Sequence, residues 1–221
     1  MLHERPTLED LKEVLEEIAG DSRIPTNFAE WVRGTLRYGG RKMRILRYIR
    51  ARTPENQTPR LLDIGAQFGA LAIYATRLGW RAAAVDYGMY AKASREAVAD
   101  RGVDYRECDL GREPLPFADN SFDFAAYTDV IEHHPFSPKR VLAEIHRVLV
   151  PGGRLLLATP GHASLYNGIK RLFGAIVNDN FDYFSTRARR RKPMTAIIGD
   201  SRARKSGRRL SKRVSASSNA A

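Results

Sequence analysis

The segment 60–78, RLLDIGAQFGALAIYATRL, constrains the fold of this chain most strongly. Residues 60–64 are apolar enough for a buried strand, and residues 65–69 form a short turn bounded by glycines. Residues 70–78 then place apolar side chains at helical spacing. Because glycine lacks a Cβ, the turn can approach a ligand closely. This arrangement is typical of nucleotide sites in doubly wound α/β proteins, although an ordinary strand–turn–helix is equally compatible with it.

Further strand-like and helical segments alternate after the glycine turn. We predict helices at 91–101 and from Pro138 onwards, the latter capped by Ser137. The predicted strands are 81–86, 103–107, 122–128 and 153–158. Repeated units of this kind predict a Rossmann-like, doubly wound and mostly parallel sheet, with helices on both faces and a ligand crevice at the carboxyl ends of the strands.

The first 59 residues are predicted to be a helical lid on this α/β domain. Thr7 begins a capping box for a helix that ends near Ala19, and a second helical stretch covers 28–52 with an interruption at Gly39-Gly40. Residues 53–59 form a polar linker. The second stretch has a basic face that is predicted to project outward, as a solvated surface or, as a minority interpretation, a contact for phosphate or an acidic substrate. Its cations are Arg41, Lys42, Arg44, Arg47 and Arg50.

The net charge of +12 is concentrated at the end of the chain. Residues 187–213 contain twelve Lys and Arg against one acid, a net of +11, which leaves +1 for residues 1–186. Apart from residues 194–198, the composition of 187–221 predicts a basic, disordered tail. A solvated tail is favoured over an arm for nucleic acid or an acidic membrane surface, because no aromatic residues are interleaved with the cations.

Composition also narrows the class of protein. The longest apolar runs fall short of the ~20 residues that a membrane span needs, and the first ten residues contain no apolar signal region. The single cysteine, Cys108, excludes an internal disulfide and suits a reducing compartment. We therefore expect a cytoplasmic protein without a membrane span; the sequence leaves its oligomeric state open.

Acidic residues follow the predicted strands where a nucleotide would lie. Asp86 ends the second strand about 20 residues after the glycine turn, which suits it to accept hydrogen bonds from both ribose hydroxyls. Asp109 follows the third strand and is either an acceptor for an adenine amino group or part of a plain turn. Gly65 and Gly69 are four residues apart, so the dinucleotide fingerprint is missing and a nicotinamide enzyme is disfavoured.

Several motifs in order resemble those of class I S-adenosylmethionine-dependent methyltransferases, close to the small-molecule type 11/23 branch. Residues 62–69, LDIGAQFG, are similar to the first family motif. The segments LPFADNSFD (115–123), DVIEH (129–133), LAEIHRVLVPGG (142–153) and 155–160 are similar to later family motifs. The resemblance covers roughly residues 60–175.

This resemblance implies S-adenosyl-L-methionine as the cofactor and assigns parts of it to residues. The methionine part is expected near Asp63, the glycine turn and Ala66, the ribose at Asp86, and the adenine at Asp109 and Leu110. Thr128 and Asp129 are expected beside the transferring methyl. The complete predicted cofactor-binding set is Asp63, Gly65, Ala66, Gln67, Gly69, Asp86, Tyr87, Asp109, Leu110, Thr128 and Asp129.

Two departures from the family pattern bear on activity. Gln67 stands at the middle glycine of the first motif, so its side chain either points away or adds a contact. After a predicted helix at 163–173, the sequence lacks the final antiparallel strand pair of the family sheet, which would leave one sheet edge unpaired. The abrupt change near Arg187 is also compatible with a truncated or shifted reading frame.

No catalytic residue is assigned. Methyl transfer depends mainly on orientation and proximity, although a hydroxyl acceptor benefits from a general base. The available histidines are His133, His134 and His162, and no metal site is predicted because consecutive residues do not converge easily on one ion.

Three functional hypotheses follow. The first is methyl transfer to a small-molecule acceptor; the others are a degenerate domain with weak or no activity, and an RNA-directed methyltransferase that uses the tail. Nucleic acid is a possible partner but not the favoured one. The predicted organisation is an N-terminal helical segment at 1–59, a methyltransferase domain at 60–186 and the basic tail at 187–221.

Overall fold

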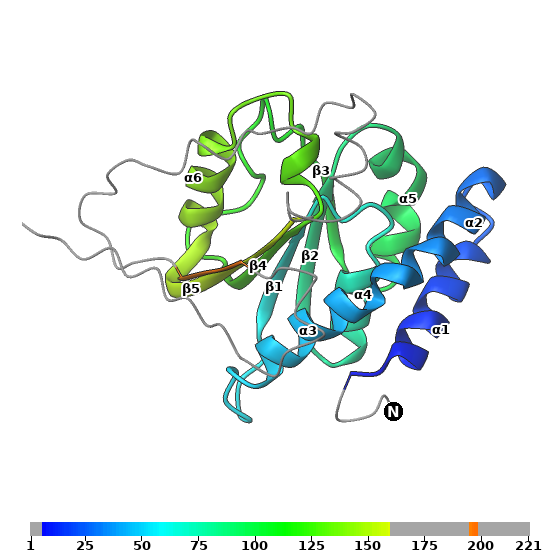
Figure 1. Cartoon of the computed structure of the whole chain (residues 1–221), viewed down its shortest axis with the longest axis horizontal. Helices are drawn as coiled ribbons and strands as arrows, with labels where there is room; N and C mark the ends of the chain where they lie inside the picture. The colour runs from blue at the N-terminus through cyan, green and yellow to red at the C-terminus, as the bar shows by residue number, and fades with distance from the viewer. Residues whose placement is uncertain (1–5, 160–194, 199–221) are drawn as a thin grey trace, which may run out of the picture.

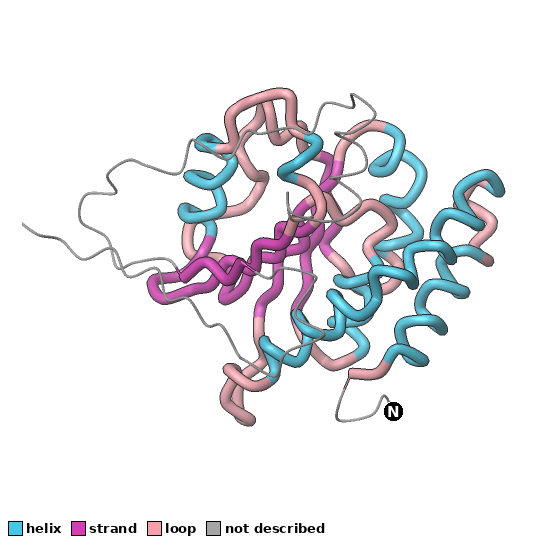
Figure 2. The backbone as a smooth tube through the Cα atoms, in the orientation of Figure 1, coloured by secondary structure: helices cyan, strands magenta, loops and turns pink. Residues whose placement is uncertain are grey.

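A computed structural model describes residues 6–159 and 195–198 of the chain. Its centre is a parallel sheet of six strands in the order β3-β2-β1-β4-β5-β6 (Figures 1 and 2). The strands are β1 (Arg60–Ile64), β2 (Arg81–Asp86), β3 (Asp104–Glu107), β4 (Phe122–Thr128), β5 (Leu149–Ala158) and β6 (Thr195–Ile198). The strand order reverses between β1 and β4, which is where doubly wound sheets open a ligand crevice. The predicted Rossmann-like fold is therefore confirmed.

Helices cover both faces of this sheet (Figure 1). They are α1 (Leu8–Ala19), α2 (Thr26–Gly34), η1 (Thr35–Tyr38), α3 (Gly39–Arg50), α4 (Ala70–Arg77), α5 (Met89–Ala99), η2 (Ile131–His133) and α6 (Lys139–Val148). One core lies between the sheet and α1–α5 and includes Leu46, Leu61 and Ile73. The second lies between the opposite face and α6 and includes Leu62, Tyr127 and Ile145. Alternate residues of the strands thus supply both cores, as the period of a strand requires.

The N-terminal helices are joined to the α/β domain by buried polar contacts. The Thr7 side chain caps α1 by accepting from the Asp10 backbone N–H at 3.1 Å, as predicted. The Tyr74 hydroxyl of α4 donates to the Asp10 carboxylate at 2.7 Å and accepts from the Thr7 N–H at 3.1 Å. Burial and the Asp10 carboxylate raise the Tyr74 pKa to about 12. These bonds fix α1 against α4.

Several predicted boundaries are correct and others differ. β1, β2 and β4 have the predicted bounds. The second helical stretch is interrupted by the 3₁₀ turn η1 rather than at Gly39-Gly40. Gly39 is the first residue of α3, and it packs closely on α1, because a Cβ there would lie 2.8 Å from the Leu8 side chain. Pro138, predicted at the first helical position, is the N-cap residue of α6, and Ser137 precedes it and accepts from the Lys139 N–H through its Oγ at 3.5 Å.

The segment 195–198 pairs in parallel with β5 from Arg154 to Leu157. The apolar segment that was set apart from the basic tail is therefore a strand, and it pairs the β5 edge that a five-stranded sheet would leave open. The predicted helix at 163–173 and the rest of the tail, 187–194 and 199–221, lie outside the described residues, as does His162.

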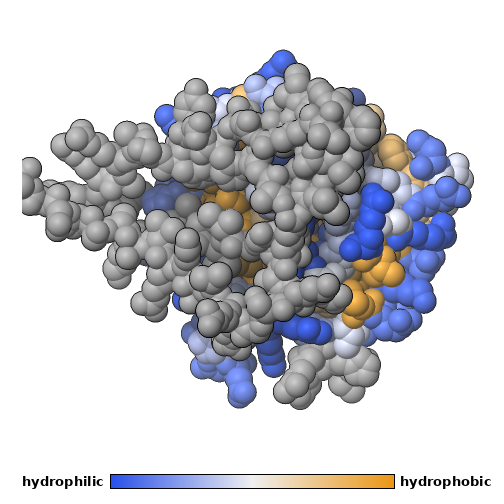
Figure 3. Space-filling model, in the orientation of Figure 1, coloured by the Kyte–Doolittle hydropathy of each residue, from blue (hydrophilic) through white to orange (hydrophobic). Residues whose placement is uncertain are grey.

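The described surface is mostly hydrophilic around the N-terminal helices, with smaller apolar areas among the charged side chains (Figure 3). Within the described residues, no helix has both the length and the apolar character that crossing a membrane requires.

Candidate functional site

The turn between β1 and α4 is bent by glycines with positive φ. Gly65 has φ +71°, and a Cβ on it would lie 2.3 Å from the Val130 side chain. Gly69 has φ +69°, and a Cβ on it would lie 2.7 Å from the Val98 side chain. The N–H groups of Gly65 and Ala66 both donate to the Val85 carbonyl, at 2.9 and 3.1 Å. The turn is thus closed against the end of β2, and only glycine fits at its two ends.

Gln67 occupies the apex of this turn with φ +53°, a region that glycine adopts more readily. Its backbone is held at both ends. The Gln67 N–H donates to Asp86 at 2.6 Å, and its carbonyl accepts from Ser94 at 3.1 Å and from the Tyr105 hydroxyl at 2.8 Å. These three bonds stabilise the left-handed backbone that the family motif obtains from glycine.

Phe68 fixes the turn to the neighbouring helices. Its ring lies 5.3 Å from Phe28 and 5.5 Å from Trp31, both of α2, and 5.8 Å from Tyr90 of α5. Aromatic pairs at these distances add favourable contacts beyond area burial. The N-terminal segment therefore helps to shape the turn, a contribution that apolar spacing alone does not reveal.

Asp86 lies at the carboxyl end of β2, where the sequence placed it. Its two oxygens accept from the Gln67 and Tyr87 N–H groups at 2.6 and 2.7 Å. Burial raises the Asp86 pKa, while the two backbone N–H donors oppose this shift. Each carboxylate oxygen retains acceptor capacity beyond these bonds, which suits a ligand with hydroxyl donors. Tyr87, next to it, is largely exposed.

Asp63 is the penultimate residue of β1 and one of the most buried acids in the described chain. Burial raises its pKa to about 7, the nearby Lys42 ammonium lowers it, and Asp86 raises it further. Burial in turn lowers the Lys42 pKa, which Asp63 raises. Asp63 and Lys42 are thus a partly desolvated pair of opposite charges beside the glycine turn.

The placement of Lys42 and Arg41 corrects the prediction that the whole basic face of α3 projects outward. Both side chains lie toward the strand ends, and the Arg41 guanidinium forms an ion pair with Asp129 at the end of β4. The first turn of α3 lies near Asp129 and Asp63, a proximity that the helical spacing of apolar residues does not predict. Further along α3, Arg44, Arg47 and Arg50 are exposed, as predicted.

Thr128 and Asp129 lie at the carboxyl end of β4, and β1 separates this strand from β2, which Asp86 ends. Thr128 ends β4, and Asp129 follows it with φ +58°, held by its N–H bond to the Ala158 carbonyl at 2.8 Å. Glu132 of η2 lies near Arg41 and accepts from the Thr159 hydroxyl at 3.2 Å. This end of the site therefore combines a backbone hydrogen bond with contacts between charged side chains.

Asp109 and Leu110 begin the loop between β3 and β4. The Asp109 side chain accepts from the Gly111 N–H at 2.9 Å, which is the turn that was the alternative to an adenine contact. The adenine role stays a prediction. Leu110 packs against the core on the α6 side of the sheet.

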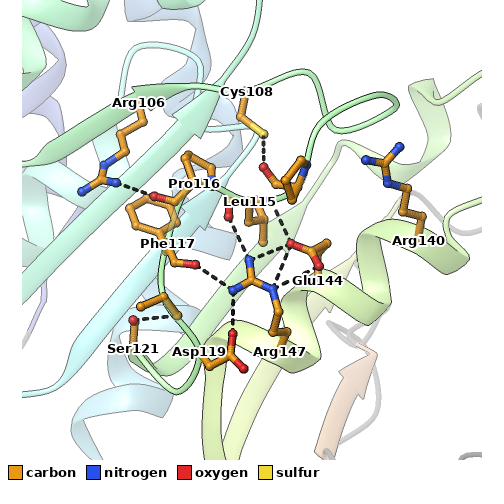
Figure 4. A network of polar contacts seen from close by, with 12 residues as sticks. Arg106, Cys108, Leu115, Pro116, Phe117, Asp119, Ser121, Arg140, Glu144 and Arg147 are labelled. Carbon is orange, nitrogen blue, oxygen red and sulfur yellow. Dashed lines mark hydrogen bonds and ion pairs between the residues drawn. The ribbon is translucent and has the colours of Figure 1, made fainter.

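The remainder of this loop is fastened to α6 by Arg147 (Figure 4). Its guanidinium donates to the Leu115 and Phe117 carbonyls at 2.9 and 2.8 Å, and pairs with Glu144 at 2.7 Å and Asp119 at 2.9 Å. Two segments of the family resemblance, 115–123 and 142–153, therefore meet here for a structural reason. The network holds the loop that follows Asp109.

Two of the candidate histidines differ in surroundings. His133 is exposed, whereas His134 is buried, stacks on Phe136 with ring centroids 4.4 Å apart, and has its Nδ1 2.9 Å from the Tyr127 hydroxyl. Burial, with a further effect of His133, lowers the His134 pKa, which favours the neutral ring. Within the described residues, no group of three metal-ligating side chains is found.

The structure thus brings Asp63, the glycine turn, Asp86 and Asp129 to the carboxyl ends of three neighbouring strands, β2, β1 and β4. Sequence reasoning missed Arg41 and Lys42 as members of this edge, and Ser94 and Tyr105 as supports of Gln67. No spacing rule identifies them, because each comes from a helix or strand whose approach to the turn depends on tertiary packing.

Comparison with known proteins agrees with this geometry. Residues 62–157 match the family described as "Methyltransferase domain". The strand order and this match support, for residues 62–157, the predicted resemblance to class I S-adenosylmethionine-dependent methyltransferases and the predicted cofactor.

Named relatives give more detail. A ubiquinone/menaquinone biosynthesis C-methyltransferase from Desulfotalea psychrophila is 29% identical over 119 residues, which cover 52% of this chain and 47% of the relative. A demethylmenaquinone methyltransferase from Thermus thermophilus is 34% identical over 108 residues, 47% of this chain and 48% of the relative. The chain spans about half the length of these curated relatives. A solved S-adenosylmethionine-dependent methyltransferase from Thermotoga maritima is 25% identical, with a TM-score of 0.48 over 66% of this chain and 65% of that one.

Proposed function

We propose that this protein transfers a methyl group from S-adenosylmethionine to a small-molecule acceptor, and that the acceptor is a ring carbon of a quinone-type molecule. The observation that carries the first part is the convergence of Asp63, the glycine turn and Asp86 at the strand ends within the matched family domain. The acceptor class is supported by the names of two relatives, both C-methyl or demethylmenaquinone methyltransferases.

The residues at this edge fit the cofactor chemically. A Cβ at Gly65 or Gly69 would collide with neighbouring side chains, so the turn leaves backbone open to a close approach there. Asp86 retains acceptor capacity for ribose hydroxyls, and Asp63 offers a negative charge near the turn for an ammonium group. Ala66, Gln67, Tyr87, Asp109, Leu110, Thr128 and Asp129 complete the proposed binding set.

The contribution of this chain to the reaction is binding and orientation. When bound, S-adenosylmethionine supplies a methyl group on a positively charged sulfur. Asp86 and the turn fix the nucleoside, and Thr128 with Asp129 border the space that an acceptor enters. Transfer to a ring carbon of the reduced, quinol form of the acceptor would break the sulfur–methyl bond, leave S-adenosylhomocysteine and release the proton of that ring carbon to water. Holding the two reactants in line would lower the barrier to the transfer itself. We assign no catalytic residue.

The first test is calorimetric titration of the full chain with S-adenosylmethionine. Asp86→Asn removes the negative charge that accepts hydroxyl donors, so we expect the affinity to fall about 10- to 150-fold, since hydrogen bonds to a charged group contribute about 1.5–3 kcal/mol. Asp104→Asn is the matched control, because this acid lies at the opposite end of the adjacent strand and pairs only with Arg106 among the described residues. It should leave the affinity unchanged.

The acceptor is tested separately with methyl-labelled S-adenosylmethionine and a short-chain demethylmenaquinol. At a cofactor concentration below the wild-type dissociation constant, we expect labelled product from the wild type and a rate lower by the same factor as the affinity from Asp86→Asn. Absence of cofactor binding by the folded wild type contradicts the whole proposal. Binding without transfer to any quinol contradicts only the acceptor class.

A further inference from the structure

The outer side of η1 and α3 carries positive charge that the protein itself does not balance. Residues 31–54 contain eight Lys and Arg and no Asp or Glu. Among the described residues, only two of these eight cations form ion pairs with acids. Three of the others follow one another at three-residue spacing along α3, which places them on one exposed side of the helix. We call the exposed surface formed by Leu8, Arg37, Tyr38, Arg44, Arg47 and Arg50 the α3 basic surface.

Two large apolar side chains belong to this surface. Leu8 is 51% exposed and Tyr38 is 45% exposed. The Arg37 guanidinium lies over the Tyr38 ring, 4.9 Å from its centroid. Leu8 contacts the start of α3, where a Cβ on Gly39 would lie 2.8 Å from the Leu8 side chain. The cations therefore surround exposed apolar side chains instead of standing on a purely polar helix face.

Residues next to Leu8 join the two ends of this surface. The Arg47 guanidinium donates to the carbonyl of Pro6 at 2.9 Å, two residues before Leu8. Three acids of the neighbouring helix α1 are already paired with cations outside the α3 basic surface: Glu9 with Lys12, Glu16 with Arg33 and Glu17 with Arg77. The surface thus presents net positive charge together with apolar side chains.

An anionic lipid bilayer has the chemistry that complements such a surface. Arginine side chains reach headgroup phosphates, and each cation near an anionic membrane adds to binding. Leucine and tyrosine side chains fit the boundary between headgroups and acyl chains. A nucleic acid would also satisfy the cations, but its phosphates offer no apolar layer to Leu8.

We propose that the α3 basic surface docks this protein on an anionic lipid bilayer, with the cations at the headgroup phosphates and Leu8 and Tyr38 at the level below. The first turn of α3 lies beside the end of β4, because Arg41 forms an ion pair with Asp129. In the docked protein, α3 lies between the bilayer and this end of the sheet. Docking does not depend on the reaction, whereas delivery of an apolar acceptor from the bilayer rests on the proposed function.

The experiment measures co-sedimentation of the full chain with two kinds of vesicle. One kind is phosphatidylcholine, and the other is equal parts phosphatidylcholine and phosphatidylglycerol. We expect the wild type to bind the anionic vesicles at least about 10-fold more tightly than the neutral ones. Each cation at an anionic surface contributes about 5-fold, so the triple variant Arg37→Gln, Arg44→Gln and Arg50→Gln should bind anionic vesicles about 100-fold more weakly.

The matched control removes the same charge from exposed positions of β2 and α5. It carries Arg81→Gln, Lys92→Gln and Arg95→Gln, and it should bind anionic vesicles within about 3-fold of the wild type. The basic residues at 187–213 are present in every variant, so the two triple variants differ only in which surface has lost its charge. Circular dichroism verifies that each variant is folded.

Leu8→Gln separates a bilayer from a nucleic acid. Burial of a partly exposed leucine contributes about 5-fold, so this variant should bind anionic vesicles about 5-fold more weakly and bind single-stranded poly(U) like the wild type. Equal vesicle binding by the two triple variants, or no effect of Leu8→Gln on vesicles, overturns the proposal. Loss of poly(U) binding with vesicle binding intact in the first triple variant also overturns it, and identifies nucleic acid as the partner. Titration with S-adenosylmethionine on the same samples tests the proposed function separately, because vesicle binding does not require the cofactor.

Discussion

The glycine turn after β1 and the segment after β4 follow neighbouring parallel strands but are held differently. In the turn, the Gln67 N–H donates to Asp86, and the Gln67 carbonyl accepts from Ser94 and Tyr105. The segment that begins at Asp129 is held by the bond from the Asp129 N–H to the Ala158 carbonyl at 2.8 Å and by the ion pair between Asp129 and Arg41. The turn therefore depends on side chains of β2, α5 and β3, whereas the segment after β4 depends on β5 and on the first turn of α3.

The largest effect is expected where the two regions touch. Gly65→Ala introduces a Cβ within 2.3 Å of the Val130 side chain, at a residue with φ +71°. Overpacking costs about 1–3 kcal/mol and a left-handed backbone about 1–2 kcal/mol, so the free energy of unfolding should fall by about 2–5 kcal/mol. Chemical denaturation measures this loss.

Gly79→Ala separates the two contributions. Gly79 has φ +77°, but a Cβ there would meet no atom within 4 Å among the described residues, so only the backbone cost of about 1–2 kcal/mol applies. Val130→Ala combined with Gly65→Ala should recover the steric part. If Gly65→Ala and Gly79→Ala lower the free energy of unfolding equally, the glycine turn and Val130 after β4 are not in close contact.

Much of this arrangement follows from the sequence, and the reason is local. Residues 60–64, 81–86 and 122–128 are apolar runs whose length and flanking turns identify buried strands, and Gly65 and Asp86 lie at their ends. Arg41 and Lys42 were predicted to be solvated because helical periodicity reports which face of a helix is apolar, not what lies beyond its first turn. Likewise, the support of Gln67 by Tyr105 joins residues 38 positions apart. Contacts between distant segments are where sequence reasoning stopped.

The pH dependence of stability tests whether Asp63 is as desolvated as the crevice implies. Its pKa rises from 3.8 to about 7 on folding, so between these values the unfolded chain releases a proton that the folded protein retains. Stability from this group therefore falls as pH rises through this window, and the fall is complete above about pH 7. Between pH 5 and pH 8 we expect a loss of about 1–3 kcal/mol, at about 1.4 kcal/mol per pKa unit.

Asp63→Asn should remove this part of the pH dependence, as measured by urea unfolding at both pH values. Asp104→Asn changes an exposed acid and is the control, with the wild-type slope retained. If Asp63→Asn keeps the full slope, the pH dependence comes from other groups, and the Asp63 carboxyl is less desolvated in the folded protein than its raised pKa implies.

Gln67 provides the smallest and most discriminating comparison. The turn is held through the Gln67 N–H and carbonyl, and these groups are present in any residue except proline. Gln67→Gly relieves a φ of +53° but increases the freedom of the unfolded chain, so the free energy of unfolding should change by less than about 1 kcal/mol. Affinity for S-adenosylmethionine should stay within about 2-fold, because no side-chain contact is lost.

Calorimetry measures both the free energy of unfolding and the affinity for S-adenosylmethionine. It is carried out on Gln67→Gly and on Gln67→Val, whose branched side chain disfavours positive φ. A loss of affinity in Gln67→Gly with stability intact would mean that the glutamine amide itself contacts the ligand. The turn would then bind through a side chain that the family motif lacks.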